Sequence, residues 1–517
     1  MKPKSEQLGK QDRLVTQLAE LSFEYIVIGA GPNGILLAKN LVENGKQVLL
    51  IESGGLDSEE GLITRDSYNF SSPTKMPSGI HTVGGGSTQW LGRVGQFIPS
   101  DFKEQAGHSE SWPIKFEELD KYFKEVFGLI TESDKLDREV IESNALLRRL
   151  EPRLPTKMQL RLFRFSNLNV YIEILTKLLA NKNFLLLTKT TCLEILKNKD
   201  FGYTLNLKSS NSSSEITRMV AKNVVVCGGT MQSTALMMRS KNLDVPAREN
   251  VMGRYLMEHF DGFVGSLVVK RSNSNLLNEF ALDLNRKLDS HNFGISFSLT
   301  DIEIASRGLP NLHFEVTNFT KKFLFDRGNN FIKIPELVRA TLFFSERLVR
   351  KAGDVIMKIY DRAQNQKRYS LWMKGEELPN PDSTLYLSEN EKLFGIPKLI
   401  YNHKISSKTS ILVRTELNLI QQIIYQSNLG QFRVYRQLLN THKNIYLNPN
   451  WHPMGTMRMG RNKQEAICDS NLEVFNNPGL YLLNAAVFPS GSNQNPTAMV
   501  MALGQRLAAH LLKINSV

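Results

Sequence analysis

Residues 25–34 read YIVIGAGPNG, an apolar run followed by a glycine-rich segment. Its first four residues are apolar and typical of a buried strand, and apolar residues recur at helical spacing after its last glycine. Between these elements, Gly29, Gly31 and Gly34 form the pattern Gly-x-Gly-x-x-Gly. The first permits a tight turn, the second lets the backbone approach a pyrophosphate, and the third lets helix and strand pack closely. The phosphates of a dinucleotide would lie at the helix N-terminus, where free N–H groups and the helix dipole favour anions.

A second buried strand, Val48–Ile51, completes a βαβ unit of the kind that begins a parallel sheet. Glu52 ends this strand 18 positions after Gly34, where its carboxylate is placed to bind the ribose hydroxyls of an adenosine. A glycine-rich turn without a ligand is the alternative, but strand, glycines, helix and acid all agree on a dinucleotide. The motif alone does not distinguish FAD from NAD.

Later segments repeat the pattern of a buried strand followed by a helix. Residues 223–227 are an apolar strand that stops at Gly228, and residues 480–483 are another, before a helix from Thr497 to about residue 512. Strands near residues 25, 48, 224 and 481 are therefore predicted to share one sheet. Further strands are predicted at 184–188, 193–196, 203–207 and 215–220.

The 517 residues are too many for one compact core, so two domains or one elaborated domain are expected. The chain has no run of 18 apolar residues and no apolar leader, which predicts a cytoplasmic location without a spanning helix. Cys192, Cys227 and Cys468 form no C-x-x-C pair, so no metal site is expected. The net charge is +13, and residues 321–370 hold twelve Lys or Arg against five acids. No nucleic-acid signature accompanies this charge, so no nucleic-acid partner is expected.

Five stretches, in order along the chain, carry a resemblance to a known family. They are the glycine motif with Glu52-Ser53-Gly54, TVGGGST at 82–88, residues 224–240 followed by GRYLMEH at 253–259, PNPDS at 379–383, and WHPMGT at 451–456 with the closing run to His510. With these segments the chain resembles the glucose–methanol–choline (GMC) oxidoreductases, in which FAD is the redox cofactor. Residues 263–370 match only weakly.

The resemblance implies an α/β fold with two domains. A Rossmann-like FAD-binding domain would comprise residues 23–115, 181–262 and 445–517. Residues 116–180 and 263–444 would form an α+β substrate-binding domain, an antiparallel sheet flanked by helices, with its helical cover. The implied cofactor-binding residues are Gly29, Gly31, Gly34, Glu52, Ser53, Gly85, Gly86, Ser87, Thr88, Cys192, Gly228, Ala486, Asn495, Pro496 and Thr497.

Elementary chemistry supports these assignments for the second glycine loop. Residues 84–86 remove side chains where a backbone must approach a flat, charged cofactor. Ser87 and Thr88 can then donate hydroxyls to phosphate or flavin oxygens. A plain flexible loop is the alternative.

His452 is the candidate catalytic base, because neutral imidazole accepts protons near pH 7. The resemblance implies that it takes the proton of a substrate hydroxyl while hydride moves from carbon to flavin N5. Asn495 occupies the partner position, where the family has His or Asn, and its amide can hold the same hydroxyl. A loop histidine satisfied by the backbone and a helix-start asparagine before Pro496 are the alternatives. His259, in the GRYLMEH stretch, is interpreted as structural.

Two departures from the family pattern affect the flavin site. Some members attach FAD through a histidine just after the Gly-Ser-Thr loop, and this chain has Gln89 there, so FAD is expected to be bound without a covalent link. Asn484-Ala485-Ala486 replaces an acidic residue or glycine before Ala-Ser, which affects only detailed flavin contacts.

The PNPDS stretch resembles the branch of the family that acts on sugars and amino sugars. The expected function is therefore oxidation of an alcohol, sugar or polyol-like substrate, with oxygen, a quinone or another carrier as electron acceptor. A non-redox lyase like the hydroxynitrile lyases, or a photoenzyme, is the alternative. Residues 335–368 combine apolar residues at helical spacing with Lys and Arg, as a peripheral membrane contact or acidic-carrier-protein contact would, or as an amphipathic cover would.

Overall fold

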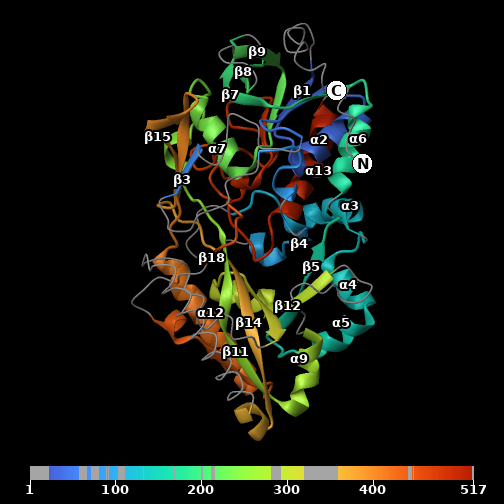
Figure 1. The fold of residues 1–517 in the computed structure, drawn as a ribbon, viewed down its shortest axis with the longest axis vertical. Coiled ribbons are helices and arrows are strands. Elements are labelled where there is room, and N and C mark those ends of the chain that lie inside the picture. The colour runs from blue at the N-terminus through green and yellow to red at the C-terminus, as the bar shows by residue number, and fades with distance from the viewer. Residues whose placement is uncertain are drawn as a thin grey trace, which may run out of the picture.

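The two main sheets of the protein lie one above the other in an elongated molecule (Figure 1). The computed structural model describes residues 23–56, 67–70, 81–88, 90, 92–102, 111–131, 133–167, 169–199, 202–210, 216–280, 293–318, 359–440, 445 and 448–514. The upper sheet in this view is parallel and the lower one is antiparallel. The predicted fold class, a parallel α/β domain with a second antiparallel α+β domain, is confirmed.

The parallel sheet has the strand order β19-β10-β1-β2-β6. Its strands are β1 (Tyr25–Ile28), β2 (Val48–Ile51), β6 (Phe184–Leu187), β10 (Asn223–Val226) and β19 (Leu480–Leu482). Every residue of the central strand β1 is buried, as expected for an apolar run inside a parallel sheet. The predicted association of strands near residues 25, 48, 224 and 481 is confirmed, and β6 adds the edge beside β2.

Helices from both halves of the sequence surround this sheet. They are α2 (Pro32–Glu43), α3 (Asp120–Ile130), α6 (Val170–Leu179), α7 (Gly229–Arg239), α8 (Arg248–Val251) and α13 (Thr497–Ile514). Helix α13 packs against α2 and α3, and α2 packs against α6. The apolar faces of α3 and α6 belong to the same core as the parallel sheet. This corrects the expectation that all of residues 116–180 goes with the second domain, while the remaining domain boundaries stay a prediction.

The antiparallel sheet has the order β17-β11-β14-β13-β12-β5-β4, with β18 also paired to β11. Its strands are β4 (Arg93–Val94), β5 (Met158–Phe165), β11 (His259–Lys270), β12 (Phe293–Leu299), β13 (Leu312–Asn318), β14 (Gln366–Glu376), β17 (Gln431–Val434) and β18 (Asn448–Pro449). Helix α12 (Ser407–Gln426) covers it and buries an apolar stripe that includes Val413, Leu417 and Ile420 (Figure 1). Shorter helices are α4 (Asp137–Ser143), α5 (Ala145–Leu150), α9 (Ser274–Phe280) and α10 (Asp301–Arg307).

Two smaller sheets complete the fold. One is the antiparallel meander β7 (Thr190–Lys197), β8 (Tyr203–Ser209) and β9 (Ile216–Ala221), which confirms the strands predicted there. The other joins β3 (Tyr68–Phe70), β15 (Thr384–Leu393) and β16 (Ile396–Asn402).

The structure bears only partly on the expectations about membranes, metals and the basic segment. In the part of the chain that is described, no helix is long and apolar enough to cross a membrane, and no cluster of three His, Cys, Asp or Glu could hold a metal. The basic segment 335–368 falls mostly on residues 319–358, which lie outside the described residues.

Candidate active site

The first glycine loop leaves an open space in front of α2. Gly29 has a φ of +108°, and a Cβ there would lie 2.8 Å from the carbonyl carbon of Cys227. A Cβ on Gly34 would lie 2.0 Å from the carbonyl oxygen of Gly29, so helix and strand could not pack as they do. At Gly31, by contrast, a Cβ would meet no atom of the described residues within 4 Å. Gly29 and Gly34 therefore serve the fold, and Gly31 leaves room for a ligand at the helix N-terminus.

The second glycine loop closes this space from the other side. The backbone N–H of Gly84 donates to the carbonyl oxygen of Ala30 at 2.8 Å, and a Cβ on Gly85 would lie 3.3 Å from the Cα of Gly31. Asn33, in the first turn of α2, has a buried Oδ1 with no hydrogen-bond partner among the described residues. Two backbone loops without side chains leave room for the pyrophosphate of a dinucleotide such as FAD.

Glu52 lies beside this cradle and is already hydrogen-bonded to it. Its two carboxylate oxygens accept the N–H groups of Ala30 and Gly54, each at 2.9 Å. Burial raises the pKa of Glu52, while these backbone hydrogen bonds act in the opposite direction. Each carboxylate oxygen keeps a second lone pair that can accept a hydrogen bond from a ribose hydroxyl. The role of Glu52 in binding ribose stays a prediction.

The neighbouring candidates for adenosine binding also lie here. The Oγ of Ser53 lies 2.6 Å from the Oγ1 of Thr191, and Cys192 follows in β7 with its side chain buried. Gly228 stands at the N-terminus of α7, just after β10, the strand that pairs with β1. The structure therefore gathers these residues around the end of the βαβ unit, and their contacts with FAD stay predictions.

Ser87 and Thr88 both donate to carbonyl oxygens of their own loop. The Ser87 hydroxyl donates to the carbonyl oxygen of Gly84 at 2.7 Å, and the Thr88 hydroxyl donates to that of Gly85 at 2.9 Å. Both hydroxyl protons thus stabilise the turn itself, because a hydroxyl has only one proton to donate. Their contacts with phosphate or flavin oxygens stay predictions. Gln89 lies outside the described residues.

His452 is paired with a second histidine. Its Nδ1 lies 3.0 Å from the Nδ1 of His259, whose Nε2 lies 2.5 Å from the carbonyl oxygen of Ser492. A carbonyl can only accept, so His259 carries its proton on Nε2 when neutral, and its Nδ1 is an acceptor. His452 must then donate from Nδ1, which leaves the lone pair of its Nε2 free to accept a proton. The pair therefore selects the tautomer that a general base requires.

The backbone around His452 is held by a buried carboxylate and a strained residue. Its N–H donates to the Oε2 of Glu258 at 2.7 Å, and the Oε1 of Glu258 accepts the hydroxyl of Tyr401 at 2.8 Å. Burial raises the pKa of Glu258 to about 7. Trp451 has a φ of +60°, a conformation that costs a non-glycine residue roughly 1–3 kcal/mol. The loop thus fixes the base at the expense of local backbone strain.

Asn495 is fixed at both ends of its amide. Its Nδ2 donates to the carbonyl oxygen of Arg93 at 2.8 Å, and its Oδ1 accepts from the Nζ of Lys374. Lys374 also lowers the pKa of His452, so the His452 imidazole and the Asn495 amide both lie near the Lys374 ammonium. Of the two hydrogens on Nδ2, one remains for another acceptor. The structure therefore brings the two candidate catalytic residues together from segments 43 positions apart.

Electrostatics keep the base neutral. Burial lowers the pKa of His452 well below its usual range, and Lys374, His259 and Arg93 lower it further. Burial also lowers the pKa of Lys374 to about 7, with Arg93 acting in the same direction. Asp261 and the other nearby carboxylates oppose that shift. At neutral pH the imidazole is accordingly in the form that can accept a proton.

Sequence reasoning did not assign Lys374 or Arg93, and it interpreted His259 as structural. Lys374 stands in an otherwise largely apolar buried strand, LWMKGE at 371–376, and a buried lysine there is the one signal that could have drawn attention. No motif surrounds Arg93.

The remaining implied cofactor residues surround the loop of Asn495. Ala486 is buried in a short 3-10 turn (Ala485–Val487), where its N–H donates to the Oδ1 of Asn484 at 3.0 Å. Pro496 and Thr497 lead into α13. These positions flank the catalytic candidates, and their flavin contacts stay predictions.

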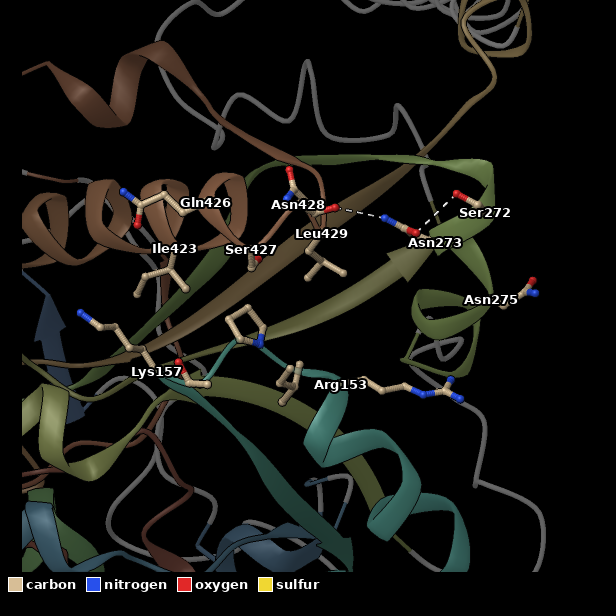
Figure 2. A pocket seen from close by; sticks show the side chains of 13 residues that line it. Arg153, Lys157, Ser272, Asn273, Asn275, Ile423, Gln426, Ser427, Asn428 and Leu429 are labelled. Atoms are coloured by element: carbon tan, nitrogen blue, oxygen red, sulfur yellow. Dashed lines mark hydrogen bonds between the residues drawn. The ribbon is translucent and has the colours of Figure 1, made fainter.

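A cavity of about 760 Å³ lies elsewhere, at the end of the antiparallel sheet (Figure 2). Residues from the α5–β5 connection, the start of α9 and the end of α12 line it, including Arg153, Lys157 and Gln426. Asn273 bridges two of these segments by donating to the carbonyl oxygen of Asn428 at 3.1 Å. None of the candidate site residues lines this cavity, so it is separate from the active site.

A family model and a curated protein each match part of this chain. Residues 379–504 match a C-terminal family model described as GMC oxidoreductase. The large subunit of fructose dehydrogenase from Gluconobacter japonicus is 25% identical over 143 residues, which are 20% of this chain and 26% of that protein. The chain thus matches about a quarter of the length of this curated relative.

Solved structures extend the likeness to the whole chain. Pyridoxine 4-oxidase from Mesorbium loti has a TM-score of 0.58 at 16% identity, over 95% of this chain and 99% of that one. An FAD-dependent oxidoreductase from Chaetomium thermophilum has a TM-score of 0.55 at 14% identity, over 96% and 100%. Formate oxidase has a TM-score of 0.56 at 14% identity, over 96% and 98%. The GMC oxidoreductase model thus matches the C-terminal part of the chain, and these solved structures share the fold of nearly the whole chain.

Proposed function

We propose that this protein oxidises a substrate alcohol to the carbonyl, with His452 as the base. The observation that carries the proposal is the chain of contacts from Ser492 through His259 to His452. It holds the base in the tautomer whose Nε2 can accept a proton. A histidine that only packed in a loop would not need its tautomer fixed by a second, fully buried histidine.

The two candidate catalytic residues, His452 and Asn495, have different roles. His452 accepts the hydroxyl proton at Nε2 while the remaining Nδ2–H of Asn495 donates to the same oxygen and holds it in place. When bound, FAD supplies the hydride acceptor. The neutral form of His452 is favoured by burial, so the base is ready at neutral pH.

A polar substrate of the sugar, amino-sugar or polyol class fits the surroundings of the site. Asp261 lies directly opposite Lys374 in the sheet register, and burial raises the pKa of Asp261 to about 6. Phe263 and Trp372 stack edge to face beside them, with ring centroids 4.7 Å apart. Charged groups next to aromatic faces suit a polyhydroxylated molecule, and fructose dehydrogenase, a curated relative, is named for a sugar. Oxygen, a quinone or another carrier would accept the electrons.

The experiment that tests the function is anaerobic mixing of the FAD-loaded protein with a panel of sugars, amino sugars, polyols and simple alcohols. We expect at least one polar alcohol to bleach the flavin absorbance. In the His452→Ala variant the same reaction should be slower by ~10²–10⁴-fold, the usual range for a lost general base, with FAD still bound. A flavin that stays oxidised with the whole panel, or a variant that is reduced at the original rate, would refute the proposal. A lyase of the same family would convert its substrate with the flavin oxidised throughout.

A further inference from the structure

Lys374 lies on the face of the antiparallel sheet that carries the partner of the base. In the register, Lys374 of β14 stands opposite Asp261 of β11 and His313 of β13. Directly opposite residues on neighbouring strands point to the same face, and so do residues two apart on one strand. His259, two positions before Asp261, is therefore on this face, and its ring contacts His452.

The hydrogen-bond partner of Lys374 distinguishes it from the other buried cations of this sheet. Arg161, Arg164 and Arg368 each bind an aspartate, at 2.9, 2.8 and 2.9 Å respectively. Lys374 instead donates to the amide oxygen of Asn495, and none of the ion pairs found among the described residues includes it. Asp261, Glu315 and Glu258 favour its charge from farther away.

A buried ammonium that served only the fold would be expected to bind a carboxylate directly, because burying a charge is costly without such a partner. Lys374 is only 4% exposed, yet its short contact is to a neutral side chain in the candidate active site. In the proposed function, only the side chain of Asn495 therefore lies between the positive charge of Lys374 and the substrate oxygen that reacts.

We propose that Lys374 is a positioning residue that holds the Asn495 amide with its Nδ2 toward the substrate oxygen and adds a positive charge behind it. The inference rests on the proposed function and adds a third residue to it. The Nζ of Lys374 donates to Oδ1, so the amide oxygen points toward Lys374 and not toward the substrate. The substrate proton goes to His452, and Lys374 keeps its own protons. The charge favours the negative oxygen that develops as the hydroxyl proton leaves.

Lys374→Met and Lys367→Met form a matched pair of variants. Lys367 lies in the same strand and its Nζ also donates to an asparagine, Asn278, but it is far along β14 from the site. Both variants are loaded with FAD, and flavin reduction by the best alcohol is followed by stopped flow. We expect Lys374→Met to slow reduction by ~10²-fold, the scale of one lost donor to a developing oxyanion, and Lys367→Met to leave it unchanged.

A second measurement needs no substrate chemistry. Azide is added to the oxidised FAD-loaded proteins, and its binding is followed through the flavin spectrum. The affinity for this small anion should fall ~10-fold or more in Lys374→Met, the scale of one contact to a charged group, and stay constant in Lys367→Met. Lys374→Gln, which keeps a donor to Asn495 without the charge, should lose azide binding but reduce the flavin faster than Lys374→Met. It also replaces Lys374→Met if that variant does not fold.

The same rates in the Asn495→Ala background show whether Lys374 acts through the amide. There, Lys374→Met should cost clearly less than it does alone. Equal losses in both backgrounds, or azide affinity and reduction unchanged in Lys374→Met, would overturn the inference. If no alcohol reduces the flavin of the unaltered protein, the proposed function fails, and the azide measurement still decides whether Lys374 supplies the charge.

Discussion

The Nδ1 atoms of His259 and His452 lie 3.0 Å apart, with the two rings nearly perpendicular at 79°. Because His259 donates its Nε2–H to Ser492, its Nδ1 can only accept. The tautomer of His452 is therefore set by the first residue of β11, His259, and by a carbonyl in the loop that holds Asn495. A single loop histidine thus becomes a base with one free nitrogen.

Removing this contact should impair the base without removing it. In His259→Leu the Nδ1–H of His452 loses its acceptor, and the imidazole can place its proton on either nitrogen. Flavin reduction should slow by ~10-fold or more while FAD stays bound, since one misplaced catalytic group typically costs at least that much. Stopped-flow reduction of His259→Leu and His259→Gln compares the two cases. Retention of the full rate in His259→Leu would mean that His259 only packs, as the sequence suggested.

The rate of flavin reduction should depend on pH through two groups, His452 and Lys374. Burial keeps the pKa of His452 well below its usual range, so the base stays neutral and the rate should not fall between pH 8 and pH 6.5 for lack of base. The pKa of Lys374, lowered to about 7 by burial, means that its charge is lost as pH rises through that value. Arg93, Asp261 and the carboxylates behind them surround the same ammonium.

Reduction by the best alcohol should therefore decline on the alkaline side, near pH 7, and this decline should be absent in Lys374→Met. Rates measured from pH 5.5 to pH 9 at saturating substrate check this. An alkaline limb of equal midpoint in both proteins would assign it to another group.

Replacing Gly31 or Gly34 by valine should have different effects on folding and on FAD binding. A side chain at Gly31 meets no described atom within 4 Å, and its φ of −74° suits any residue, so Gly31→Val should fold. It should lose FAD, because the side chain fills the space for the pyrophosphate. Gly34→Val should instead fail to fold well, because its Cβ would overlap the carbonyl oxygen of Gly29. Thermal midpoint and flavin content of both variants separate the cases. Full FAD content in Gly31→Val would place the phosphates elsewhere.

The flavin should be released on denaturation. We expect yellow protein whose flavin leaves with the supernatant after acid or heat precipitation, because Gln89 stands where some family members have a tethering histidine. The measurement is the absorbance of supernatant and pellet near 450 nm. The released flavin should also be identified by mass. Flavin that remains in the pellet would show a covalent bond.

The sequence predicted the parallel sheet because its signals are local. The run YIVI, the glycines after it and VLLI at 48–51 specify strand, turn and second strand within 27 residues. The site is different, because its contacts join residues far apart: His259 meets His452 across 193 positions, and Lys374 meets Asn495 across 121. Strand register decides which of these meet, and periodicity along one strand cannot reveal it. The hydrogen bond from the Ser87 hydroxyl to the carbonyl oxygen of Gly84 is likewise visible only in the folded loop.

Asn495 allows the sharpest test of the site as a unit. If its amide holds the substrate oxygen, Asn495→Ala should slow reduction less than His452→Ala does, and it should weaken substrate binding by about 0.5–1.5 kcal/mol, the net value of one hydrogen bond. The double variant should cost less than the sum of the two losses, because a base gains little from a hydroxyl that is not aligned with it. If Asn495 only starts α13, its thermal midpoint falls and its rate per bound flavin does not. Thermal midpoints and reduction rates on the same three variants distinguish these outcomes, and strict additivity would remove Asn495 from the catalytic residues.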